Sequence, residues 1–163
     1  MVWAMAVVVA GLAAAAGAWA YTASVREPGT APRHPVGAVS PYNATAVSVD
    51  LASAGATATF YGFETSGRAI RFFAVLGSDG GVRTAFDNAY CCFRRDLGER
   101  QEGADMVCNW CGKHFPIDEL NRTNLDPLTV GRCCPAHLRN TVVGGKVVIE
   151  MADLEAGAYL FTK

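Results

Sequence analysis

The sequence predicts a mainly β fold, in which a small β-hairpin domain carries a zinc-ribbon-like cysteine knuckle and follows one apolar N-terminal helix. Three observations predict it: strand-forming residues alternate with glycine turns, six cysteines fall within residues 91–134, and residues 2–21 are apolar or small. A chain of 163 residues holds one domain with an appendage, which excludes a large multidomain enzyme.

The N-terminal segment is predicted to meet a membrane. No Lys, Arg, Asp or Glu precedes Arg26, and as a helix residues 2–21 would cross a hydrocarbon core about 30 Å thick. We expect residues 1–25 to be a transmembrane anchor or uncleaved signal helix, although Ala18-Trp19-Ala20 also has the form of a signal-peptidase site. Small residues in the run would permit a homo-oligomer through residues 2–21.

The rest of the chain is predicted to be a linker followed by strands. Residues 26–41 are rich in Pro and Gly and read as a spacer, so the Cys-rich domain is expected over residues 42–163. Within it we expect one or two strands over residues 46–63 and hairpins at 70–86 and 141–150, turning at Asp79-Gly80 and Gly144-Gly145. Residues 116–125 hold a turn or two of helix at most.

The sharpest motif is Cys108-Asn109-Trp110-Cys111-Gly112, which has the form of a metal-binding knuckle. Two residues separate the thiolates, and the following glycine permits the left-handed backbone of such a turn. The same spacing also occurs in redox dithiols and disulfides.

Two doubled cysteines accompany the knuckle, Cys91-Cys92 and Cys133-Cys134. Neighbouring side chains of an extended strand point to opposite faces, so one of each pair could complete a four-thiolate site. If all six cysteines take part, the site is polynuclear and favours copper or an iron cluster. His137 could add a nitrogen ligand. In an oxidising exterior, the six cysteines could instead form three disulfides.

Several further motifs carry a family resemblance: Gln101-Glu102-Gly103, the knuckle itself, residues 115–118 and Gly131-x-Cys133-x-Pro135. Over about residues 68–150 the chain resembles a family of prokaryotic predicted membrane proteins that carry a cysteine-rich iron-sulfur-containing domain. Some members are linked to high-affinity iron permeases. The resemblance implies the metal ligands Cys92, Cys108, Cys111 and Cys133. It also shows a departure, since many members have Cys-x-x-Cys where this chain has residues 89–92.

We therefore expect a membrane-anchored, extracytoplasmic metal-binding protein that acts in metal uptake or electron transfer. Its thiolates would hold iron or an iron-sulfur cluster, with copper or zinc as other possibilities, and Cys91, Cys134 and His137 would extend the site. The expected partners are the membrane and a metal permease or redox partner. The alternative is a structural zinc-ribbon or disulfide-stapled subunit of a surface assembly, secreted if the helix is cleaved.

Two classes of function are not expected. With a net charge of -1 and no long basic run, the sequence predicts no basic surface that would bind the phosphates of nucleic acid. No hydrolase, zincin, Walker or dinucleotide-binding pattern occurs, so we do not expect an enzyme.

Overall fold

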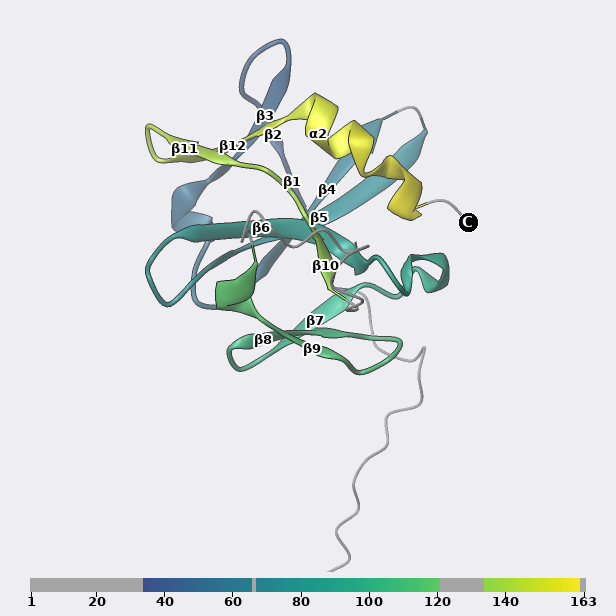
Figure 1. Cartoon of the computed structure of the whole chain (residues 1–163). Helices are drawn as coiled ribbons and strands as arrows, with labels where there is room; N and C mark the ends of the chain where they lie inside the picture. Colours follow the sequence, from purple (N-terminus) through teal and green to yellow (C-terminus); the bar gives the residue numbers. More distant parts are fainter. Residues whose placement is uncertain (1–33, 66, 121–133, 162–163) are drawn as a thin grey trace, which may run out of the picture.

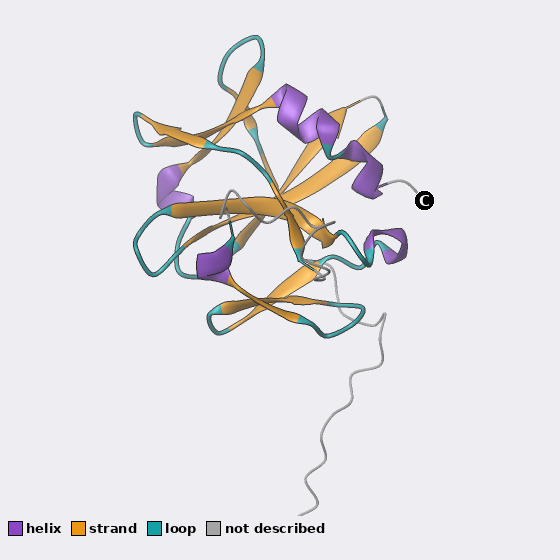
Figure 2. Cartoon of the chain, in the orientation of Figure 1, coloured by secondary structure: helices purple, strands orange, loops and turns teal. Residues whose placement is uncertain are grey.

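The structure, a computed structural model, describes residues 34–65, 67–120 and 134–161 (Figure 1). The predicted mainly β fold is confirmed, since strands dominate and the helices are short (Figure 2). The predicted N-terminal helix lies outside the described residues. In the part of the chain that is described, no helix combines the length and apolar character needed to span a membrane.

Three sheets build the domain. The central sheet has five strands in the order β1-β4-β5-β6-β10, and only the β1–β4 pair is parallel. Its strands are β1 (Gly37–Ala38), β4 (Thr59–Thr65), β5 (Arg68–Leu76), β6 (Val82–Ala89) and β10 (Pro135–His137).

The two outer sheets lie on opposite sides of the central sheet (Figure 1). One has the order β11-β12-β3-β2, formed by β11 (Thr141–Val143), β12 (Lys146–Glu150), β3 (Ala46–Asp50) and β2 (Ser40–Pro41). The other has the order β7-β8-β9, formed by β7 (Glu99–Glu102), β8 (Asp105–Cys108) and β9 (His114–Pro116). Short helical segments complete the fold: η1 (Leu51–Ser53), η2 (Phe93–Arg95), η3 (Ile117–Glu119), α2 (Met151–Ala156) and η4 (Ala158–Phe161).

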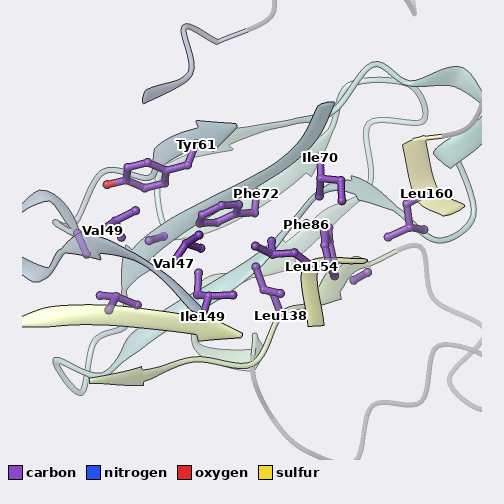
Figure 3. Packing of buried hydrophobic residues seen from close by; sticks show 14 residues of the cluster. Val47, Val49, Tyr61, Ile70, Phe72, Phe86, Leu138, Ile149, Leu154 and Leu160 are labelled. Atoms are coloured by element: carbon purple, nitrogen blue, oxygen red, sulfur yellow. The ribbon is translucent and has the colours of Figure 1, made fainter. Parts of the chain in front are cut away.

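Strand β5 is buried on both faces, which explains its almost continuous run of apolar residues. Ile70, Phe72 and Ala74 face the core shared with β3, β12 and α2 (Figure 3). Phe73 and Val75 point the other way, into a second core with residues of β8 and β9. The central sheet is thus the middle of three layers, and the third layer carries part of the cysteine segment.

The predicted hairpins are confirmed, and other elements differ from expectation. Strands β5 with β6 and β11 with β12 pair around the expected glycine turns. Strands β1 and β2 lie inside the expected spacer, so the sheets begin before Tyr42. The β7–β8 hairpin has no counterpart in the sequence prediction, because β7 reads Glu-Arg-Gln-Glu and offers no apolar alternation.

A substitution at Phe72 tests the packing of the three-layer core. Phe72 is fully buried against the sheet that contains β3 and β12. We therefore expect Phe72→Ala to lower the free energy of unfolding by about 3–5 kcal/mol, through lost burial and the cavity left behind. Val142→Ala, at a 47% exposed position, should change it by less than about 0.5 kcal/mol. Urea unfolding measures both, and equal effects would contradict this packing.

Candidate metal centre

The first part of the site is the loop that joins β6 to β7. Strand β6 ends at Ala89, and the Cys92 N–H donates to the Ala89 carbonyl oxygen over 3.0 Å, which turns the chain sharply. The loop then makes the single turn of η2. Cys91 is exposed, whereas only 9% of Cys92 is exposed. The doubled cysteines therefore differ in exposure, but their Sγ atoms lie only 3.2 Å apart, so the expectation that neighbouring cysteines point to opposite faces is wrong for this pair.

The second part is the knuckle at the end of β8. The Gly112 N–H donates to the Cys108 carbonyl oxygen over 2.9 Å, and the Cys108 N–H donates to the Lys113 carbonyl oxygen over 3.0 Å. Gly112 adopts a φ of 68°, a conformation that suits glycine. This is the turn that the Cys-x-x-Cys-Gly spacing predicts, and it returns Cys111 toward Cys108.

Asn109 fastens the knuckle to the loop. Its backbone N–H donates to the Gly98 carbonyl oxygen over 3.1 Å, and its side-chain Nδ2 donates to the Leu97 carbonyl oxygen over 3.0 Å. The Arg100 guanidinium donates to the remaining amide oxygen over 3.1 Å. Because Asn109 is buried, these bonds hold the two cysteine segments together away from water.

Asp87, near the end of β6, anchors the far end of the loop. One carboxylate oxygen accepts the Glu99 N–H over 2.7 Å, and the other accepts Arg71 Nε over 3.3 Å. Arg71 Nη2 also donates to Asp96 Oδ1 over 2.5 Å, which ties the loop back to β5. At Gly98 a Cβ atom would lie 2.6 Å from Asp87 Oδ1, and its φ of 70° also favours glycine.

These hydrogen bonds and ion pairs bring together sulfur atoms of the β6–β7 loop and of the knuckle. The Sγ atoms of Cys91, Cys92 and Cys111 lie within 4.8 Å of one another, and those of Cys91 and Cys92 are 3.2 Å apart. Cys108 packs beside Cys92 in a small buried cluster covered by Trp110. Cys91 is disulfide-bonded, whereas Cys92, Cys108 and Cys111 are in the thiol form.

The sulfur atoms differ in acidity. Burial raises the pKa of Cys92, and the charge of Cys108 raises it further. Burial also raises the pKa of Cys108, and here the charge of Glu99 adds to the effect. Burial alone would also raise the pKa of Cys111. Hydrogen bonds from the Lys113 N–H and from the thiols of Cys108 and Cys92 outweigh it, so the Cys111 pKa is lowered. Cys111 is therefore the sulfur that ionises most readily, and the thiolate is the form that binds metals.

The other predicted site residues lie elsewhere or outside the described residues. Cys134 is buried in the second core, among side chains that include Phe73 and Met106. His137, on β10, lines an open groove with Tyr42 and Arg139, where burial and the Arg139 charge lower its pKa. Neither belongs to the group of three sulfurs. Cys133 lies outside the described residues.

Sequence reasoning missed Glu99, which faces the site from β7. It pairs with Cys108 across the β7–β8 hairpin, so both side chains lie on one face of that sheet. Only 1% of Glu99 is exposed, and its Oε1 has no hydrogen-bond partner among the residues that the structure describes. Burial raises its pKa well above the usual range, and the charges of Asp87 and Cys111 add to this effect. The two-residue turn between Glu102 and Asp105 was the signal that could have revealed this pairing.

The ion-pair network around Arg71 should be required for folding of the loop. Arg71→Met would leave Asp87 and Asp96 as buried charges without their cation, which costs about 3–5 kcal/mol of unfolding free energy. Arg68→Met on the same strand, where the side chain is exposed, is the matched control. Guanidinium unfolding measures both. A loss below about 1 kcal/mol in Arg71→Met would show that the network is dispensable.

Glu99 should make the stability of the reduced, metal-free chain depend on pH. Its folded pKa lies well above the ordinary 4.5, so between these two values the folded chain binds more protons than the unfolded chain. The unfolding free energy therefore falls as pH rises from about 4.5 through the folded pKa. Glu99→Gln should make this decline shallower, whereas Glu102→Gln, at an exposed position, should not. Urea unfolding across pH provides the measurement, and unchanged decline in Glu99→Gln would refute this assignment.

Comparison with known proteins identifies the family but no close relative. No curated protein and no solved structure matches the chain. A family model described as membrane iron-sulfur containing protein FtrD-like matches residues 54–161. The match spans β4 to η4 and includes every residue of the sulfur group, so it agrees with the resemblance carried by the knuckle and its flanking motifs. The chain therefore belongs to the FtrD-like family of membrane iron-sulfur containing proteins.

Proposed function

We propose that this chain is a membrane-anchored protein whose cysteine site binds iron, as an ion or an iron-sulfur cluster, outside the cytoplasm. Its role would be in metal uptake or in electron transfer to a metal-transport partner. The observation that carries the proposal is the meeting of three sulfur atoms from two separate segments within 4.8 Å at the domain surface. The family description, a membrane protein that contains iron-sulfur, supports the same chemistry.

The residues present fit such a group. Thiolates are soft ligands that select iron, zinc or copper over magnesium and calcium. Cys92, Cys108 and Cys111 supply three thiols, and the resemblance to the family implies Cys133 as a fourth ligand. Cys91 could donate only after its disulfide is reduced. When bound, the iron would supply one-electron chemistry or be held for transfer.

The surroundings of the sulfur group support exchange with a partner. Cys111 is exposed, so one ligand lies at the surface, while Cys92 and Cys108 are buried beneath Trp110. The Arg95 guanidinium stacks 4.1 Å from the centre of the Trp110 ring and covers it. Hydrogen bonds to sulfur, such as the one from the Lys113 N–H, tune the potential of thiolate-bound iron.

One observation favours a second function, a structural domain stapled by cysteines. Cys91 is disulfide-bonded, as expected for a cross-linked surface subunit. In that case the remaining thiols would hold zinc or no metal, and the cysteines would serve only the fold. Zinc has no redox chemistry, so colour and its response to dithionite separate the two functions.

Iron loading of the full chain tests the proposal. The purified chain, reduced and reconstituted anaerobically with ferrous iron and sulfide, should retain iron and show visible absorption that dithionite bleaches. Cys108→Ser should remove both, because Cys108 is a buried thiol that packs beside Cys92. Iron content per chain and the absorption spectrum are the measurements.

Cys134→Ala is the matched control, since Cys134 is an equally buried cysteine in the hydrophobic core. It should leave iron content and colour unchanged. Colourless protein that retains zinc, or iron content that is the same in Cys108→Ser and the wild type, would overturn the proposal.

A further inference from the structure

Glu99 is the buried group that neither the fold nor the sulfur ligands explain. The residue is 1% exposed, yet within the described part of the chain its Oε1 has no hydrogen-bond partner. Buried carboxyl groups are normally paired or bound to a metal ion, because an unpartnered polar atom loses its hydration without compensation. An unpartnered glutamate beside a group of metal-binding sulfurs therefore needs a reason.

The position of Glu99 is set by the scaffold of the site. The bond from its backbone N–H to Asp87 fixes the start of β7, and the β7–β8 register places its side chain beside that of Cys108. Directly opposite residues of an antiparallel pair have Cβ atoms about 4.5–5.5 Å apart. Paired residues project to the same face of a sheet, so the Glu99 carboxyl group lies on the side of the hairpin that carries the Cys108 side chain.

Neighbouring cations do not satisfy Glu99. The charged and titratable groups around it are Asp87, Arg100, Cys108 and Cys111. Of these only Arg100 is cationic, and its guanidinium donates to Glu102 and Asn109 instead. Near Asp87, Arg71 is likewise engaged by its two aspartates. Among the described residues, the Glu99 carboxyl thus faces sulfur and carboxylate groups without a cation of its own.

We propose that Glu99 supplies an oxygen ligand to the metal ion that the cysteines bind, which makes the centre a mixed thiolate–carboxylate site for a divalent first-row metal. A cation between Glu99 and the sulfurs of Cys108 and Cys111 would partner the orphaned oxygen and neutralise the charges that face it. Glu99 and Cys108 both lie outside the three sulfurs found within 4.8 Å of one another, so side chains must move for one ion to be shared by Glu99, Cys108 and Cys111. This inference rests on the proposed metal-binding function.

Cobalt(II) is the probe for the test, because its visible bands report ligand type and its near-ultraviolet bands report thiolate bonds. The reduced full chain is titrated anaerobically with Co(II) as wild type, Glu99→Gln, Glu99→Asp and Glu102→Gln. Glu99→Gln should weaken Co(II) binding by about tenfold or more and shift the visible ligand-field bands. It should keep the thiolate charge-transfer bands. Glu99→Asp, which retains a carboxylate, should recover part of the affinity.

Glu102→Gln is the control, because this glutamate belongs to the same strand but lies exposed and paired with Arg100. It should match the wild type. Near-ultraviolet circular dichroism of each metal-free chain shows whether the variants are folded.

The outcomes separate this inference from the proposed function. Wild-type affinity and band positions in folded Glu99→Gln would overturn the ligand role of Glu99 and leave thiolate binding intact. Weaker binding with unshifted ligand-field bands would also overturn it, since Glu99 would then act only on the shape of the site. Wild-type chain without thiolate charge-transfer bands would overturn both.

Discussion

The candidate metal centre depends on one buried carboxylate, that of Asp87. It accepts the Glu99 N–H with one oxygen and Arg71 with the other, and Gly98 is needed because the backbone passes too close to Asp87 for a Cβ. These contacts close the loop that carries Cys92 and set the start of the strand opposite Cys108. Burial raises the Asp87 pKa, and the hydrogen bond from the Glu99 N–H and the charge of Arg71 offset only part of this rise. The sulfur group is therefore built on a charge network as well as on hydrophobic packing.

The sequence predicted the fold where strands bury apolar residues. Residues 70–76 read as a strand because both faces of β5 are buried, and the Gly144-Gly145 turn marked the second hairpin. Strands β1 and β2 are only two residues long and were indistinguishable from a spacer. Strand β7 is polar along its whole length and has no apolar pattern. Its pairing with β8 and the hydrogen bond from the Glu99 N–H to Asp87 hold it in place instead. No local pattern can report such tertiary constraints.

The site was predicted in part for the same reason. The knuckle spacing fixes a local turn, so Cys108 and Cys111 could be recognised from the sequence, and the doubled cysteines drew attention to Cys92. The sulfurs of Cys91 and Cys92 both join the sulfur group because the chain turns sharply after Ala89, whereas Cys134 packs in the hydrophobic core, and neither outcome follows from the spacing of the doubled cysteines. Glu99 could not be recognised without the β7–β8 register, since most glutamates are exposed and this one is buried.

The arrangement combines a buried side, with Cys92, Cys108 and Glu99, and an exposed side, with Cys111 at the surface. A site of this kind excludes water from the buried side chains and leaves one edge accessible at the surface. We propose that sulfurs of the loop and of the knuckle share one metal ion. X-ray absorption at the iron edge of the reconstituted full chain tests this most directly. We expect a shell of at least three sulfur atoms bound to iron. A shell of oxygen and nitrogen atoms without sulfur would contradict it.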